Sequence, residues 1–142
     1  MTIGILGIVG CAGERPNNLG ARGGSLAACP DSPNCVSSLA ADDDRHRIAA
    51  LVFTDNPDAA FSRLKRVLGE RGDTTTVEES PGYLRVELRT LLFVDDGEFL
   101  LDRDKHLIHV RSASRLGYSD LGKNRSRMEV IRAQFLAAGP KQ

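Results

Sequence analysis

The sequence predicts a single α+β domain, with an antiparallel sheet of about four to five strands, two helices packed on one face, and an irregular N-terminal wrap. Three observations predict this class. The 142 residues are enough for one domain with its own core. The spacing of apolar residues changes from helical to alternating and back to helical along the chain. The strand-like runs are consecutive, with no βαβ alternation and no internal repeat.

The N-terminal segment resembles a lipoprotein signal. The apolar run MTIGILGIVG precedes Cys11, and in a bacterial lipobox a small residue likewise precedes the cysteine that is lipidated. The run is shorter than a working signal peptide and lacks its basic region, which a start codon upstream of Met1 would supply. The alternative is a short buried strand or a frayed terminus. We therefore expect residues 1–11 to be a truncated or atypical lipoprotein signal, with lipidation at Cys11.

Residues 12–44 are expected to be irregular, because Gly, Pro, Asn, Asp and Ser interrupt every periodic pattern. Within this segment, the stretch CPDSPNC places Cys29 and Cys35 around two prolines. A disulfide between them is favoured, since no second cysteine pair completes a metal site. A reactive thiol and a reduced or metal-bound pair are the alternatives. A disulfide and a lipobox both indicate an oxidising compartment outside the cytoplasm.

Residues 45–139 are expected to form the α+β domain. Residues 46–53 are a short apolar run typical of a strand. A helix should follow, with Asp55 or Asn56 as N-cap and Pro57 in its first turn. Apolar residues at helical spacing continue this helix until Gly69 ends it.

The next runs are strand-like. TTTVEE is rich in β-formers, and YLRVELRT alternates, so that Leu84, Val86 and Leu88 share one face. LLFV, DDG and EFLLD predict a hairpin whose turn is DDG, and HLIHVRS predicts a further strand. Residues 124–138 predict the last helix, with Met128, Ile131 and Phe135 on its buried face and Gly139-Pro140 after its end.

Composition excludes several partners. The formal net charge is zero, which gives no general attraction for nucleic acid. Aromatic residues are 5% of the chain and there is no Trp, so the stacking platforms of single-strand binders are lacking. We expect no nucleic-acid partner and no cofactor, since the glycines match neither a P-loop nor a dinucleotide fingerprint.

The stretch RSASRLGYSDLGKNRSR is the strongest candidate for a binding site. It leaves a strand, passes two glycines and enters a helix, so backbone N–H groups and guanidiniums could meet there and hold an anion. The alternative is structural: Asp120 and Asn124 cap the helix, while the arginines pair with carboxylates of the DDGE stretch. The candidate anion-binding residues are Arg111, Ser112, Ser114, Arg115, Asn124 and Arg125.

A catalytic reading is the runner-up. Cys35 or Ser37 (or the adjacent Ser38) would be the nucleophile and His46 the base of a hydrolase or thiol enzyme. We expect no metal site. Asp95-Asp96-Gly97-Glu98 is better explained as a turn, and His106 and His109, three apart on a strand, lie on opposite faces.

Several stretches together resemble one family. They are Arg15-Pro16 with Leu19-Gly20, CPDSPNCVSS, HRI at His46, VDDGEF, and RSASRLGYSDLGKNRSR. In this order they resemble the bacterial and plastid family of unknown function DUF 1499, over nearly the whole chain after Cys11. The resemblance implies an exported or lipid-anchored protein, and it transfers no catalytic residues.

The expected function is therefore that of a lipoprotein-like binding or assembly module of the cell envelope. Its partners would be an anionic small molecule or an envelope protein, and the anchor at Cys11 would attach it to the membrane. If residues 1–11 are not a signal, the protein would be cytoplasmic instead.

Overall fold

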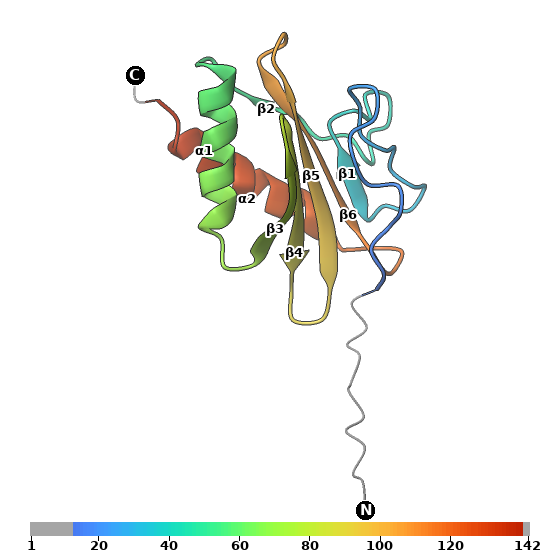
Figure 1. Ribbon diagram of the computed structural model, residues 1–142. Helices are drawn as coiled ribbons and strands as arrows, with labels where there is room; N and C mark the ends of the chain where they lie inside the picture. Colours follow the sequence, from blue (N-terminus) through green and yellow to red (C-terminus); the bar gives the residue numbers. More distant parts are fainter. Residues whose placement is uncertain (1–12, 141–142) are drawn as a thin grey trace, which may run out of the picture.

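The computed structural model describes residues 13–140, so the expected lipidation site, Cys11, lies outside the described residues. Within residues 13–140, two helices and six strands follow one another in the order β1, β2, α1, β3, β4, β5, β6, α2 (Figure 1). Their bounds are β1 Cys35–Ser37, β2 Leu51–Val52, α1 Pro57–Gly69, β3 Thr74–Ser80, β4 Tyr83–Arg89, β5 Val94–Asp102, β6 Leu107–Ser114 and α2 Lys123–Ala137.

One antiparallel sheet contains all six strands, in the order β1-β6-β5-β4-β3, and β2 also pairs with β6. The α+β class is confirmed. The strand number exceeds the expected four to five because β1 and β2, of three and two residues, both pair with β6. Cys35–Ser37 thus belongs to the sheet, although it falls in the segment expected to be irregular. Conversely, only Leu51–Val52 of the expected strand over residues 46–53 forms β2.

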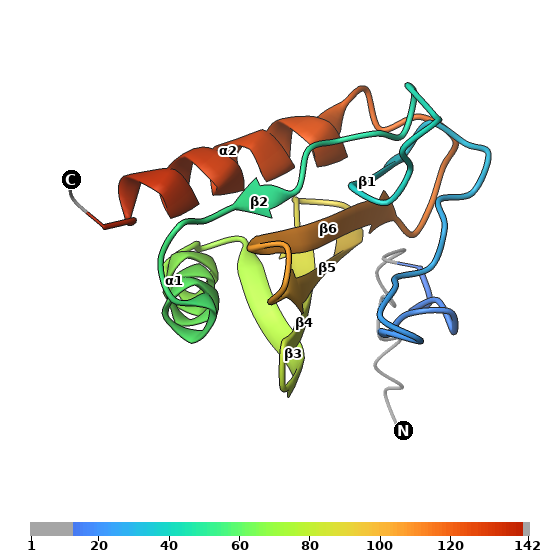
Figure 2. The same ribbon diagram turned by 90° about the horizontal axis from the view of Figure 1, so that it is seen from above.

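Both helices pack on one face of the sheet. Asn56 caps α1 as expected, because its side-chain oxygen accepts hydrogen bonds from the backbone N–H groups of Asp58 and Ala59. In the second view, α2 runs alongside β2 and β6 (Figure 2). The core between helices and sheet contains Phe99, Phe135 and the face of β4 predicted by its alternation. Within residues 13–140, no helix is long and apolar enough to cross a membrane.

The opposite face of the sheet is covered by the irregular segment that precedes β1 (blue in Figure 1). The backbone N–H of Gly20 donates a 2.8 Å hydrogen bond to Glu98 Oε2 in β5. Arg111 Nη2 in β6 donates to the carbonyl oxygen of Ala28 at 3.2 Å. The wrap is therefore tied to charged side chains, whereas the helices cover the apolar face.

The hairpin turn predicted at DDG is wrong. Gly97 lies in the middle of β5, between Val86 of β4 and Ser112 of β6. A Cβ atom there would lie 2.8 Å from Val86 Cγ2, so glycine provides space for packing within the strand and does not reverse the chain. The reversal lies at residues 90–93, where the Thr90 N–H donates to the Phe93 carbonyl oxygen at 2.9 Å.

Candidate functional site

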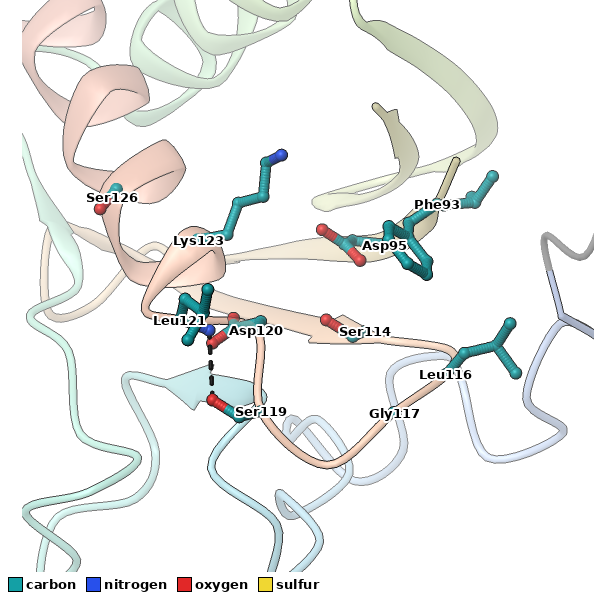
Figure 3. Close-up of a pocket in the computed structure, with 11 residues that line it drawn as sticks. Phe93, Asp95, Ser114, Leu116, Gly117, Ser119, Asp120, Leu121, Lys123 and Ser126 are labelled. Atoms are coloured by element: carbon teal, nitrogen blue, oxygen red, sulfur yellow. Dashed lines mark hydrogen bonds between the residues drawn. The ribbon is translucent and has the colours of Figure 1, made fainter. Parts of the chain in front are cut away.

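A cavity of about 540 Å³ opens where β5 begins, β6 ends and α2 starts (Figure 3). Phe93 and Leu116 contribute apolar wall on one side, and Leu121 contributes it beside the helix. The lining residues are Phe93, Val94, Asp95, Ser114, Leu116, Gly117, Ser119, Asp120, Leu121, Lys123 and Ser126. Ligand sites of small molecules commonly have this character, with apolar walls, a few polar groups and roughly 300–1,000 Å³ of volume.

The polar groups beneath this cavity are held by Asn124, which is fully buried at the start of α2. Its Nδ2 donates to Ser114 Oγ at 2.9 Å and to Asp120 Oδ2 at 2.7 Å, and its Oδ1 accepts from Ser112 Oγ at 2.6 Å. Leu121 and Gly122, the last two residues before α2, both have positive φ and turn the chain into the helix. The network therefore fixes the loop on the sheet.

Asp120 already supplies the negative charge at the helix N-terminus. Burial alone would raise the pKa of Asp120. The side chain and N–H of Asn124 and the N–H of Gly122 donate to the carboxylate, and together they hold its pKa below the usual value. The backbone N–H groups of Gly122 and Asn124 at the start of α2 are therefore already taken by this carboxylate, so an anionic ligand would need a side-chain cation as its partner.

Asp95, the other carboxylate that lines the cavity, is paired with a buried cation. Its Oδ2 accepts a 2.6 Å hydrogen bond from Arg127 Nη1, and both side chains are buried. Lys123, in contrast, is exposed at the first turn of α2, and no ion pair with it occurs among residues 13–140. Among the described residues, the cavity thus presents apolar walls, carboxylates that already have partners, and the exposed ammonium of Lys123.

The residues predicted to form an anion site fall into three separate groups. Ser112, Ser114 and Asn124 lie together on the helix side of the sheet, in the network described above. Arg111 and Arg115 lie on the other side, because side chains alternate along β6 and the residue after it. Arg125 donates to the carbonyl oxygens of residues 45 and 47.

The two arginines on the far side of the sheet take structural partners. Arg115 donates to Asp96 and to Glu87, each at 2.8 Å. The hydrogen bonds to Asp96 are the main reason that the pKa of Arg115 is raised. Arg111 Nη1 lies 3.7 Å from Glu98 Oε1, and burial lowers the pKa of Arg111. These ion pairs are the structural alternative that the sequence left open.

Glu98 is the centre of a buried ionic network under the N-terminal wrap. Its Oε2 accepts from the hydroxyl of Tyr83 at 2.6 Å as well as from Gly20. Burial, followed by the contact with Glu98, raises the pKa of Tyr83 far above its usual value. Within the described part of the chain, Arg85 Nη1, Arg111 Nε and Glu98 Oε1 have no hydrogen-bond partner. The charges here are compensated by proximity more than by directed hydrogen bonds.

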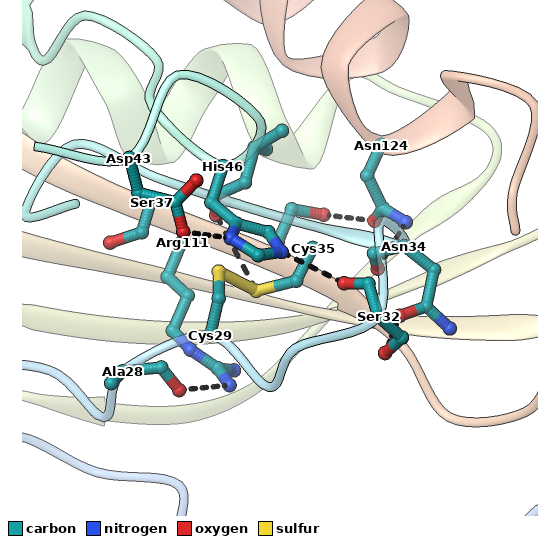
Figure 4. Close-up of a disulfide and its surroundings, with 12 residues drawn as sticks. Ala28, Cys29, Ser32, Asn34, Cys35, Ser37, Asp43, His46, Arg111 and Asn124 are labelled. Carbon is teal, nitrogen blue, oxygen red and sulfur yellow. Dashed lines mark hydrogen bonds and ion pairs between the residues drawn. A yellow bond between two sulfur atoms is a disulfide. The ribbon is translucent and has the colours of Figure 1, made fainter. Parts of the chain in front are cut away.

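The CPDSPNC stretch contains a disulfide between Cys29 and Cys35 (Figure 4). Cys35 is fully buried in β1, and the bond lies beside the Arg111 side chain. The pairing leaves neither sulfur as a thiol, which the thiol-enzyme alternative requires.

His46 is held by two acceptors. Its Nδ1 contacts the carboxylate of Asp43, and its Nε2 lies 2.8 Å from the carbonyl oxygen of Ser32. The Asp43 hydrogen bond, then the Ser32 carbonyl, raise the pKa of His46 above its ordinary value. Both nitrogens act as donors in this arrangement, and in the described residues no hydrogen bond joins the imidazole to Ser37 Oγ. Ser37 Oγ instead accepts from the N–H of Leu39.

Sequence reasoning missed the cavity and the His46–Asp43 pair. The cavity walls come from Phe93 and from the leucines of RLGYSDLG, which are large apolar residues in stretches rich in turn residues. That combination could have indicated a binding surface, since large apolar side chains in loops are not explained by the packing of a helix or strand into the core. Among residues 13–140, no three His, Cys, Asp or Glu side chains gather as metal ligands would.

The fold and this geometry define a small α+β domain with an apolar cavity at one end of its sheet. A model of the family described as "Protein of unknown function (DUF1499)" matches residues 25–135. The chain belongs to this family, as the resemblance of its motifs implied. Comparison with curated proteins and with solved structures gave no match.

Proposed function

We propose that the protein is a lipid-anchored binding module of the cell envelope, and that the cavity beside α2 takes an apolar or amphiphilic small molecule. The observation that carries the proposal is the cavity itself, with its apolar walls and a floor whose polar groups are already paired. A ligand there gains by burying apolar surface and has no unpaired buried charge to satisfy.

The exposed ammonium of Lys123 favours a ligand with an anionic group at one end. Lys123 stands at the first turn of α2 and lines the cavity, while Asp95 and Asp120 have their own partners. A carboxylate or phosphate at one end of an apolar chain would meet this ammonium. This keeps the expectation of an anionic small molecule but places its charge at Lys123, away from the arginines.

The three cysteines support the anchored half of the proposal. The Cys29–Cys35 disulfide is typical of an oxidising compartment, and Cys11 follows a lipobox-like run. Mass spectrometry of the protein purified from bacterial membranes, expressed with its upstream reading frame, tests this half. A lipid mass on Cys11 is expected, and an unmodified cysteine in the soluble fraction would reject the anchor.

The binding half is tested by filling the cavity. Ser126 lines it from α2 and is exposed, so Ser126→Trp can be accommodated by the fold and occupies the ligand's space. Titration with cis-parinaric acid, a fluorescent fatty acid, should show at least about a tenfold weaker Kd for this variant. Ser62→Trp, an exposed serine on α1, is the matched control and should bind as the unmodified chain does. Equal affinity in all three proteins would reject the cavity as the site.

The enzyme alternative has no comparable observation in its favour. Cys35 is in a disulfide, and the contacts of His46 are with Asp43 and Ser32. The binding module is therefore the function that the geometry supports best.

A further inference from the structure

Large apolar side chains are exposed around the mouth of the cavity. Leu91 and Leu121 are 98% and 96% exposed, and Leu92 and Tyr118 are 69% and 68% exposed. Phe93 is half exposed beside them. Leu116, 42% exposed, lies in the same loop as Tyr118 and Leu121. A soluble surface rarely gathers so many large apolar side chains without a partner.

These side chains come from two loops at one end of the sheet. Leu91 and Leu92 lie in the β4–β5 turn, and Tyr118 and Leu121 lie in the loop between β6 and α2 (Figure 1). The two loops meet at the cavity, which both of them line. Leu91 is almost completely exposed and projects outward from its turn, and Leu121 lines the cavity with nearly all of its side chain exposed.

The N-terminal end of the described chain lies at the same place. A Cβ atom on Gly13 would stand 2.9 Å from Leu116 Cγ, so the backbone of Gly13 packs against this apolar loop. Cys11 is two residues earlier, within about 7 Å along an extended chain. The only long apolar run of the sequence, and the cysteine expected to carry lipid, therefore join the domain at its apolar end.

The charges at this end favour contact with lipid. Asp95 is paired with Arg127, and Asp120 is held by the start of α2, so neither presents an unpaired carboxylate. Lys123 is exposed and suits anionic headgroups. Tyr118 is of a residue type that is enriched at membrane interfaces.

We propose that this end of the domain is a membrane-docking surface, in which Leu91, Leu92 and Leu121 insert between the lipids of a bilayer. A bilayer accepts projecting side chains in any arrangement, whereas a protein partner needs a matching pocket for each. Two anchoring elements, a lipid on Cys11 and inserted side chains, together give the stable attachment that a single weak element does not. The docking surface also holds the cavity mouth against the membrane. It does not depend on the proposed ligand, because Leu91 and Leu92 do not line the cavity.

The test is sedimentation of the full chain with vesicles of phosphatidylethanolamine and phosphatidylglycerol, in a Cys11→Ser background that carries no lipid. Removing Leu91 and Leu92 together (L91S/L92S) should lower the vesicle partition coefficient by roughly tenfold or more. V52S/L136S is the matched control, because Val52 and Leu136 are each 61% exposed elsewhere on the surface, and it should bind as the parent does. An unchanged partition coefficient in L91S/L92S would overturn the proposal.

A second measurement does not depend on loss of binding. The chain has no Trp, so Leu121→Trp introduces a single reporter. Its fluorescence should shift to the blue with vesicles and be quenched by brominated lipid, while Val52→Trp should show neither effect. If the indole of Leu121→Trp is already shielded in buffer, by residues 1–12 or by a second copy of the chain, and vesicles change nothing, the docking surface is refuted. Ser126→Trp should leave sedimentation of the parent unchanged, which separates failure of the ligand proposal from failure of this one.

Discussion

Replacing Glu98 by Gln should destabilise the protein strongly, since this carboxylate is fully buried among cations. Gln keeps the shape and can still accept from Tyr83 and Gly20, so the change removes mainly the charge. Arg111, 3% exposed and 3.7 Å from Glu98, then keeps a buried charge without its nearest counterion.

Breaking a buried ion pair in this way typically costs about 3–5 kcal/mol. We expect the lower end, about 3 kcal/mol, because Asp96 also stabilises the charge of Arg111 and remains in place. For a chain of 142 residues, that loss corresponds to a fall in Tm of about 10 °C.

Urea unfolding followed by circular dichroism measures the effect, and the chain offers a matched control. Glu78 contacts Arg85 at 3.3 Å in the same sheet but has a side chain 52% exposed. Glu78→Gln should therefore cost less than about 1 kcal/mol. If both variants lose the same stability, the argument that Glu98 compensates buried charge is refuted.

A double replacement sharpens this test. Glu98→Met combined with Arg111→Met removes both charges and leaves apolar side chains under the wrap. Apolar replacements of buried ion pairs are often neutral or stabilising, so the double variant should be more stable than Glu98→Gln alone. The reverse order would show that the carboxylate acts through its hydrogen bonds to Tyr83 and Gly20.

Three further predictions concern the wrap and the sheet. Because folding raises the pKa of His46, the protonated imidazole contributes stability that is fully present below pH 6.5 and is lost as pH rises through the folded-state pKa. Because folding lowers the pKa of Asp43, the contribution of its carboxylate is lost as pH falls below 3.8. Tm measured against pH should therefore decline above pH 6.5 in the unmodified chain and do so less in Asp43→Asn; parallel curves would contradict the assignment. Replacing both cysteines of the disulfide by Ser should lower the free energy of unfolding by about 2 kcal/mol, as the chain-entropy model gives for so short a loop, and dithiothreitol should not destabilise that variant further. Gly97→Ala should cost roughly 1–3 kcal/mol in urea unfolding because its Cβ has no room, whereas Gly72→Ala, which meets open space, should not destabilise.

Much of the fold could be predicted from local patterns. The start of α1 depends on Asn56 and Pro57, and the buried face of β4 follows from alternation, so neighbouring residues are sufficient to specify both. The DDG stretch shows the limit of such reasoning. Glycine after aspartate indicates a turn locally, but Gly97 is required by the crowding of Val86 on the next strand, which lies eleven residues away.

The anion site shows a different limit. RSASR continues β6, so alternation by itself separates Arg111 from Ser112 and Ser114. That separation could be derived from the sequence once the strand is extended to Ser114. The acceptors of Arg125, in contrast, are backbone carbonyls some eighty residues earlier, and no local pattern indicates them.

The sequence by itself determined the class of fold, the two helices with their ends and the family, and it favoured the Cys29–Cys35 disulfide over a thiol or metal pair, because these depend on neighbouring residues and on motifs. Only the tertiary structure decided which charges are paired and where the surface remains apolar. Glu98 accepts a hydrogen bond from Gly20 of the wrap, and the β4–β5 turn and the β6–α2 loop meet at the cavity only because β5 and β6 bring both loops to one end of the sheet. Contacts between distant segments depend on the register and order of the strands, which no short stretch of sequence specifies.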